Sequence, residues 1–412
     1  MEQVPQASGS GSGPIVELDH AIGYSGTIVR LVHLHPNGTD YIMVAGAIII
    51  INDQDNQHHF LRGHDEQITC LAVSHAGKMI ASGQRGDNSD ILIWDYDTRQ
   101  ALFRLSEHDY EVSNVEFSND DLLLLTTGNQ LDGKLFIWDT SNGYIVTSVQ
   151  LIPTVLSEPP YCTSWGGFVK DIKLRPTANY QFATSGNKLL LWSLDPSTGA
   201  LDYDQISTGT FIRKYICFSF SIPDEQYLFA GTASGDFVSF QIKHKLLVFV
   251  QNVCAQGVTC IASVSEDKVC CGGGDGTLAL YHVDGKFCQE LLRTQLVSCI
   301  NGLSASLDGI QLLVSTDRGF IYRVRVSDFS CMLLSENHVS DVLSVSFMPD
   351  VSDKFATCSE DTTIRLWDSN DYSVYARCAV LAGGFPICCN FTDEVVISGW
   401  SDGKIRSFRV DN

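Results

Sequence analysis

The chain has 412 residues, 44% of them hydrophobic and 18% charged, a composition typical of a globular protein. Its formal net charge of −21 argues against nucleic acid and membranes as partners, since proteins that bind nucleic acid or anionic lipid carry basic patches. No apolar run approaches the roughly 20 residues that a membrane-spanning helix needs.

Short strands separated by turns are predicted along almost the whole chain. Residues 1–13 are polar and rich in glycine, which predicts a disordered tail. The first strand-rich unit covers about 24–62, and the second reads most clearly, with ITCLAVS, MIASG, ILIWD and ALFRL as four strands in turn. Later units cover 106–150, 162–206, 208–251, 255–294, 297–335 and 338–380, and a ninth with only three strands covers 384–412.

An aromatic residue closes the third strand of most units. The dipeptide Trp-Asp begins at Trp94, Trp138 and Trp367, and weaker copies of the segment lie between them at intervals of 41 to 54 residues. A period in the low forties with Trp-Asp dipeptides is the signature of four-stranded propeller blades. We therefore predict an all-β WD-repeat β-propeller.

Nine units exceed the four to eight blades of a usual ring. In one solution, residues 14–337 form a seven-bladed ring, and 338–412 add two WD repeats that begin a second propeller. In the other, residues 14–23 supply the strand that the ninth blade lacks and close a single larger ring, which would leave no unpaired strand edge. We favour the first solution because it fits the usual number of blades.

Three units each contain a His, a Ser or Thr, and a Trp at similar spacings. Two of these three units also contain an Asp in a turn. These residues are His64, Ser82 and Trp94; His108, Thr126, Asp132 and Trp138; and His338, Thr357, Asp361 and Trp367. A single such set could be mistaken for a hydrolytic triad, but three copies on separate blades cannot share one active site. In WD repeats the histidine links the turn aspartate to a hydroxyl that also binds the indole N–H. We therefore predict structural tetrads and no catalytic residue.

Neither a cofactor nor a metal site is expected. The fourteen cysteines include no C-x-x-C pair, which favours free thiols in an intracellular protein. The glycine-rich segment 271–277 precedes a strand and not a helix, so it is not a phosphate-binding loop. First-strand positions are mostly apolar or small, which disfavours an enzyme and a small-molecule substrate.

Two groups of residues are candidates for contact with a protein partner. Aromatic side chains lie in and after an insertion between the third and fourth units, where exposed rings would serve as anchors. They are Tyr161, Trp165 and Phe168. Packing of these rings over the top of a blade is the alternative interpretation. Arg213 and Lys214 form the main basic spot of this acidic chain and are the second candidate.

Several stretches resemble the cilia- and flagella-associated protein 52 family of WD-repeat proteins. They include the opening ELDHAIGYSG, the ASGQ of the second unit and the final ISGWSDGKIRSF, and the similarity runs from about residue 16 to the end. Members of that family carry about fourteen repeats in two seven-bladed rings, of which this chain matches nine.

The resemblance implies a non-enzymatic scaffold of motile cilia and flagella. Such a protein would lie inside axonemal doublet microtubules, bind tubulin and neighbouring axonemal proteins, and support ciliary beating. The alternative function is a soluble cytoplasmic adaptor of a multiprotein complex, such as a ubiquitin-ligase receptor or a trafficking component.

Overall fold

The computed structural model describes residues 18–24, 26–171, 173–186, 188–209, 213–284, 286–379, 383–392 and 395–410. Every regular element in these ranges is a β-strand, which confirms the predicted all-β class. The tail predicted at residues 1–13 lies outside the described residues.

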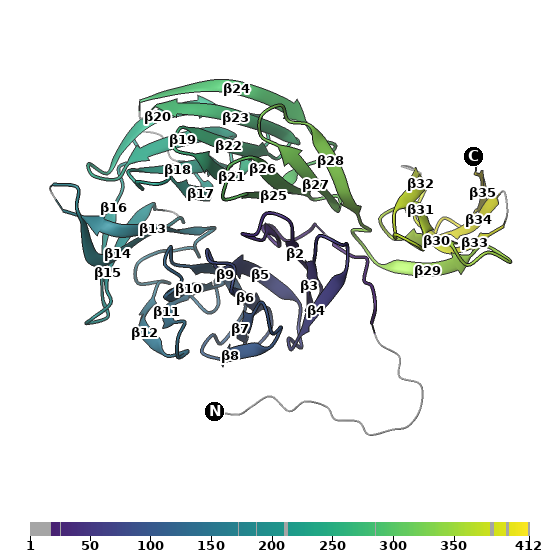
Figure 1. Cartoon of the computed structure of the whole chain (residues 1–412), viewed down its shortest axis with the longest axis horizontal. Coiled ribbons are helices and arrows are strands. Elements are labelled where there is room, and N and C mark those ends of the chain that lie inside the picture. The colour runs from purple at the N-terminus through teal and green to yellow at the C-terminus, as the bar shows by residue number, and fades with distance from the viewer. Residues whose placement is uncertain are drawn as a thin grey trace.

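The strands form nine antiparallel sheets, each built from strands that follow one another in the chain (Figure 1). We number these sheets as blades one to nine. Blades one to three contain β1 Val32–Leu34, β2 Tyr41–Ala45, β3 Ile48–Asn52 and β4 His58–Arg62; β5 Ile68–Val73, β6 Met79–Gln84, β7 Ile91–Asp95 and β8 Ala101–Leu105; and β9 Val112–Phe117, β10 Leu123–Gly128, β11 Lys134–Asp139 and β12 Ile145–Gln150. Blades four to six contain β13 Thr163–Lys170, β14 Pro176–Thr184, β15 Leu190–Asp195 and β16 Ala200–Gln205; β17 Tyr215–Phe220, β18 Tyr227–Thr232, β19 Asp236–Gln241 and β20 Leu246–Asn252; and β21 Val258–Ser265, β22 Lys268–Gly273, β23 Thr277–Asp284 and β24 Phe287–Gln295. Blades seven to nine contain β25 Ile300–Ala305, β26 Gln311–Thr316, β27 Phe320–Arg325 and β28 Cys331–Glu336; β29 Val342–Phe347, β30 Lys354–Ser359, β31 Thr363–Asp368 and β32 Val374–Ala379; and β33 Pro386–Phe391, β34 Val395–Trp400 and β35 Ile405–Arg409.

Blades one to seven surround a common hub (Figure 1). Their first strands, β1, β5, β9, β13, β17, β21 and β25, each contact the next, and β25 contacts β1. This closed circle is called the ring below. Blades eight and nine contact each other through β29 and β33 and lie to one side of the ring. The larger single ring does not form in the described chain, because residues 18–23 carry no strand and β35 pairs only with β34.

The ring closes through a buried seam between blades one and seven. The Tyr24 hydroxyl donates to Asn301 Oδ1 at 3.0 Å, and Asn301 Nδ2 donates to the carbonyl of Gly26 at 2.6 Å. Gly26 has φ of 68°, and a Cβ at this position would lie 2.7 Å from the carbonyl oxygens of Thr316 and Asp317. Only glycine fits here, since both its backbone angle and the close approach exclude a side chain.

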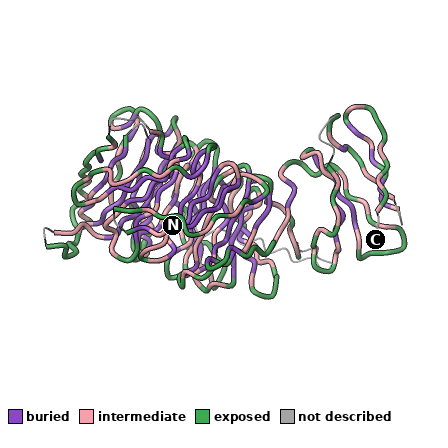
Figure 2. The backbone as a smooth tube through the Cα atoms, turned by 90° about the horizontal axis from the view of Figure 1, so that it is seen from above, coloured by how far each residue is buried: buried purple, intermediate pink, exposed green. Residues whose placement is uncertain are grey.

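Neighbouring blades of the ring pack face to face and bury their apolar side chains between them. Ile91 and Ile93 of blade two, for example, share one apolar cluster with Val112, Val115 and Phe117 of blade three. Figure 2 shows buried residues concentrated in the ring and fewer of them in the last two blades. Burial of apolar surface between blades therefore provides the main stabilisation of the ring.

Stacked rings connect the start of the described chain to blade eight. The ring of His20 lies 3.6 Å from that of His58 and 3.9 Å from that of Tyr372, centroid to centroid. Burial, reinforced by the neighbouring His20, lowers the pKa of His58 to about 4. Asp53 opposes this shift only in part. Burial lowers the pKa of His20 as well.

We expect acidification to destabilise the folded protein through His58. Its pKa is lower in the folded chain than the ordinary value of 6.5, so the unfolded chain binds more protons below pH 6.5. The free energy of unfolding should fall as pH drops from 6.5 towards 4, and the fall should be shallower in a His58→Gln variant. Denaturant titrations at several pH values measure both slopes. Equal slopes in the two proteins would contradict the assignment to His58.

Candidate functional site

Blade three assembles a complete buried tetrad from the four predicted residues. His108 Nδ1 lies 2.8 Å from Asp132 Oδ2, and its Nε2 lies 3.0 Å from Thr126 Oγ1. The indole N–H of Trp138 donates to the same hydroxyl oxygen at 3.0 Å. Burial alone would raise the pKa of Asp132, but hydrogen bonds from His108 and from two backbone N–H groups lower it below its ordinary value. The tetrad ties a loop, a turn and two strands of one blade together.

The turn of this tetrad also requires a glycine. A Cβ at Gly128 would lie 1.9 Å from Asp132 Oδ2. Any larger residue at 128 would therefore displace the aspartate from His108.

Blade eight assembles the same arrangement. His338 lies 2.8 Å from Asp361 Oδ2 through Nδ1 and 2.7 Å from Thr357 Oγ1 through Nε2. Trp367 Nε1 donates to the Thr357 hydroxyl at 2.7 Å. Arg365 Nη2 lies 3.6 Å from Asp361 Oδ2, so this carboxylate has two partners, the His338 ring and the Arg365 guanidinium.

We expect Asp361→Ala to lower the free energy of unfolding by about 2 kcal/mol, the usual contribution of a hydrogen bond to a charged group. The substitution removes the partner of His338 Nδ1 and one ionic partner of Arg365. Thermal scanning fluorimetry should show a lower melting temperature. An unchanged melting temperature would contradict a stabilising tetrad in blade eight.

Blade two lacks a turn aspartate in its tetrad and uses a glutamine in its place. His64 Nδ1 lies 2.7 Å from Gln84 Oε1, and Gln84 Nε2 donates to Asp65 Oδ1 at 2.7 Å. The other two predicted members are arranged as in the other blades. Ser82 Oγ lies 2.7 Å from His64 Nε2 and accepts a hydrogen bond from the Trp94 indole N–H at 2.9 Å. Sequence reasoning missed Gln84, although it is the last residue of the ASGQ segment already singled out.

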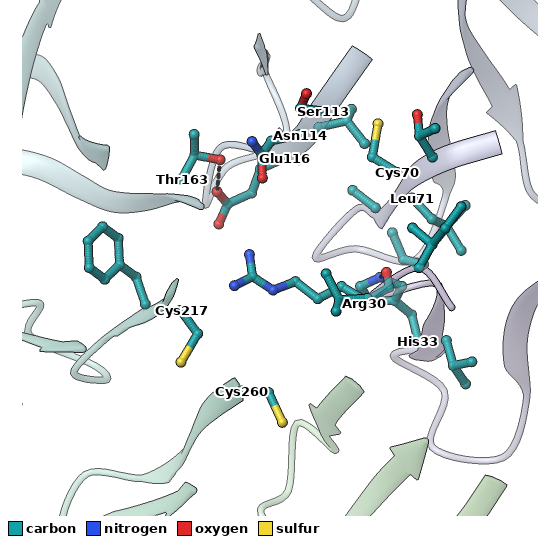
Figure 3. Close-up of a pocket in the computed structure, with 18 of the residues that line it drawn as sticks. Arg30, His33, Cys70, Leu71, Ser113, Asn114, Glu116, Thr163, Cys217 and Cys260 are labelled. Carbon is teal, nitrogen blue, oxygen red and sulfur yellow. Dashed lines mark hydrogen bonds between the residues drawn. The ribbon is translucent and has the colours of Figure 1, made fainter. Parts of the chain in front are cut away.

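A cavity of about 570 Å³ lies in the hub of the ring (Figure 3). Arg30, which lies two residues before β1 and has φ of 61°, extends into it, and its Nη2 donates to the carbonyl of Ile216 at 2.7 Å. Glu116 of β9 accepts hydrogen bonds from the Thr163 hydroxyl at 3.2 Å and the Trp165 N–H at 3.3 Å. Burial raises the pKa of Glu116 to about 7.

Sequence reasoning also missed the polarity of this hub. The first predicted unit, residues 24–62, contains Arg30, but its first observed strand begins only at Val32, after the left-handed backbone at Arg30. Glu116 occurs in the VSNVEF alternation of β9, which places it on the face that meets blade four. The hub thus holds the Arg30 guanidinium and a carboxyl group with a raised pKa between walls that mix apolar and polar side chains.

The residues predicted to contact a partner do not form one surface. Trp165 is buried within β13, and its Nε1 donates to the backbone carbonyl of Glu116 at 3.0 Å. The prediction that the Trp165 ring is exposed is wrong, because its side chain is buried between blade three and blade four. Phe168 is half-buried against Tyr180, with ring centroids 4.9 Å apart.

The other three candidates lie closer together. Lys214 Nζ lies 4.0 Å from the centroid of the Tyr161 ring, and the Tyr161 hydroxyl donates to Glu158 at 2.6 Å. Arg213 lies 3.7 Å from Asp236 and is mostly covered. Tyr161 also lines the hub cavity, so the pair formed by Tyr161 and Lys214 lies at its edge.

The reactive side chains of the described residues are dispersed. All fourteen cysteines are free, and most are buried. Nowhere in the described ranges do three His, Cys, Asp or Glu side chains gather as metal ligands. Nor does that part of the chain contain a helix long and apolar enough to cross a membrane.

Comparison with known proteins agrees with this architecture. The family model described as WD domain, G-beta repeat matches residues 55–95, 99–139 and 329–368, which end at the Trp-Asp dipeptides of the three tetrad blades. The solved "Structure of U3-55K" aligns with a TM-score of 0.57 at 17% identity, covering 76% of this chain and 98% of that one, and shows the fold alone.

Curated relatives extend the similarity over nearly the whole chain. Cilia- and flagella-associated protein 52 of Homo sapiens is 29% identical over 407 residues, which is 95% of this chain and 63% of the relative. The protein of that name from Chlamydomonas reinhardtii is also 29% identical, over 96% of this chain and 63% of its own length. The chain therefore spans less than two thirds of the length of these relatives. It is a WD40-repeat β-propeller protein whose curated homologues are named cilia- and flagella-associated protein 52.

Proposed function

We propose that this protein is a non-enzymatic scaffold of motile cilia or flagella. The observation that carries the proposal is the similarity, over 95% of the chain, to proteins named for their association with cilia and flagella. In finer detail, we propose that it binds tubulin and neighbouring inner proteins within axonemal doublet microtubules and supports ciliary beating. The protein would then reside in the axoneme, within the cytoplasmic compartment of the cilium.

The physical character of the ring supports a scaffold. The first strands of its seven blades pack against one another around the hub, and tetrads and a closing seam hold the loops at fixed positions. A rigid surface of this kind can bind a partner without losing much conformational entropy. The net charge of −21 favours basic or neutral protein surfaces as partners.

We also propose that residues 14–337 and 338–412 form two structural units. The apolar cluster of blades eight and nine contains Ala356, Trp400 and their neighbours and shares no residue with the clusters of the ring. Separate cores are what two units that fold around their own apolar faces would have.

Localisation in a ciliated cell tests the proposed function. A tagged copy of the chain should concentrate in cilia and should remain with axonemes after detergent removes the ciliary membrane. High salt should then release the protein from the axonemes if its contacts there are mainly ionic. A position inside the doublet microtubule should instead make it resist extraction by salt. Complete release with the soluble cytoplasm and absence from isolated axonemes would overturn the proposal and favour the soluble adaptor.

A further inference from the structure

A guanidinium group and a carboxyl group face each other in the hub cavity. Figure 3 shows the side chain of Arg30 extending from blade one towards Glu116 of blade three and Cys217 of blade five. Arg30 and Glu116 are both half-buried and both line the cavity. Its volume of about 570 Å³ is within the range of pockets that bind small molecules. The cavity therefore has room for a ligand that contacts both groups.

Blade four holds the Glu116 carboxyl group in place. Its Oε1 accepts a hydrogen bond from the Trp165 backbone N–H, and its Oε2 accepts one from the Thr163 hydroxyl. Burial is the main reason that the pKa of Glu116 rises to about 7, and these two hydrogen bonds oppose the rise. The positive charge of Arg30 opposes it less than either hydrogen bond does, so the two charged groups are not held in direct contact. At neutral pH, Glu116 is therefore protonated in about half of the molecules.

The charge of Arg30 lacks a fixed counter-charge whenever Glu116 is protonated. Arginine stays charged at every pH of interest, and the carbonyl of Ile216 that accepts from Arg30 is neutral. Among the described residues that line the cavity, Arg85 and Glu111 lie on loops at one rim and carry opposite charges. An enclosed charge without a partner is costly. The hub is thus a positive site in a chain whose net charge is −21.

The other titratable groups near Arg30 and Glu116 do not supply this counter-charge. They are His33, Cys70, Cys162, Cys217, Cys260, Tyr161 and His75. Burial lowers the pKa of His33 and raises the pKa values of the four cysteines, so these five groups are neutral near pH 7. The Tyr161 hydroxyl donates to Glu158. His75 lies at the opposite rim, beyond the end of β5, with its Nδ1 at 3.2 Å from Asp121.

We propose that the hub cavity binds a carboxylate group. The planar guanidinium of Arg30 donates to the carboxylate through its N–H groups, and protonated Glu116 donates through Oε2 to the other oxygen. The apolar side chains of Leu71, Val115 and Ile261 cover the rest of the ligand. A carboxylate fits better than a phosphate group, whose greater charge and additional oxygens need more donors than these two side chains provide. The carboxylate belongs to a small molecule or to an acidic side chain of a partner. This inference does not rest on the proposed ciliary function.

Isothermal titration calorimetry with phenylacetate tests the site. This probe combines an ionised carboxylate with an apolar ring that suits the cavity walls. Phenylacetamide is the matched neutral probe, with nearly the same shape and no charge. Phenylacetate should bind at one site per chain, and phenylacetamide should bind at least about tenfold more weakly. Equal affinities for the two probes, or no binding of phenylacetate up to about 10 mM, would overturn the proposal.

The pH dependence of binding tests the contact with Glu116. A pKa of about 7 leaves about nine tenths of the Glu116 carboxyls protonated at pH 6 and about one tenth at pH 8, so phenylacetate should bind about tenfold more tightly at pH 6. Glu116→Gln keeps a donor without a titrating proton, and its affinity should not change with pH. His75→Gln is the matched control and should keep the tenfold change. An unsubstituted protein with the same affinity at both pH values would contradict the contact.

Arg30→Met should abolish binding of phenylacetate, because it removes the positive charge and the paired donors. Proton uptake provides a second measurement on the unsubstituted protein, which decides the matter if Arg30→Met does not fold. Titrations at pH 7 in two buffers with different heats of ionisation should show that about half a proton is taken up per bound phenylacetate. Binding without proton uptake would contradict the proposed pairing of the ligand with Glu116.

Blocked peptides distinguish the two sources of the carboxylate. A short peptide with both ends blocked and a single glutamate should bind if the ligand is an acidic side chain of a partner. Its glutamine counterpart should not bind. Binding of phenylacetate without binding of the glutamate peptide would assign the site to a small-molecule carboxylate.

Discussion

Replacing Asp132 by alanine should lower the free energy of unfolding by about 3 kcal/mol. This is close to the loss of stability that follows when one partner of a buried ion pair is removed. The carboxylate is fully enclosed with His108, and it also accepts from the backbone N–H groups of Asp109 and Lys134. Alanine would leave the buried His108 ring nitrogen and these two backbone N–H groups without the carboxylate that they now contact. Each unpaired buried donor adds a desolvation penalty.

The midpoint of urea unfolding, followed by tryptophan fluorescence, measures this effect. Asp132→Asn keeps the shape of the side chain but not its charge and should lose less. Asp97→Ala removes an exposed turn aspartate and should leave the midpoint in place. If Asp132→Ala and Asp97→Ala unfold at the same denaturant concentration, the buried tetrad does not stabilise the ring.

Tyr24→Ala should lower the free energy of unfolding by about 4 kcal/mol, because it removes a large buried aromatic side chain. Tyr24 lies among the apolar side chains of blade one and blade seven, including Leu313 and Ile321. Its loss leaves a cavity at the seam where the first and last blades of the ring meet. The ring should then open at β1 and β25 before other blades unfold.

Hydrogen exchange resolved by peptide tests this order of opening. Strands β1 and β25 should exchange faster in Tyr24→Ala, while β13 and β17 on the far side of the ring keep their protection. Tyr24→Phe should lose only about 1 kcal/mol, since Asn301 Oδ1 still receives the Ser315 hydroxyl at 2.8 Å. Uniformly faster exchange around the whole ring would contradict a local seam.

The blade tetrads could be predicted because their members lie close together in the chain. His108, Thr126 and Trp138 belong to one repeat, and the repeat specifies both their spacing and their strands. Where a residue of the repeat changes, the prediction weakens. Blade two keeps the spacing of blade three, but Asn88 stands at the position of Asp132, and Gln84 takes the place beside His64.

The hub and the seam could not be predicted in the same way. Arg30 meets Ile216, and Tyr24 meets Asn301, across separations of 186 and 277 residues. The burial of Trp165 could not be predicted either, because an aromatic residue that follows an insertion is compatible with a surface position or a buried one. Its burial depends on blade three and blade four packing together around it.

By itself, the amino-acid sequence determined the repeating four-stranded unit, the all-β class and the tetrads, because strand alternation, turns and short-range hydrogen bonds act within about forty residues. The tertiary structure decided how many blades close the ring and which polar groups meet in its hub. Closure of the ring depends on contacts between residues hundreds of positions apart, and the hub depends on contacts between different blades, so both exist only once the blades have packed together.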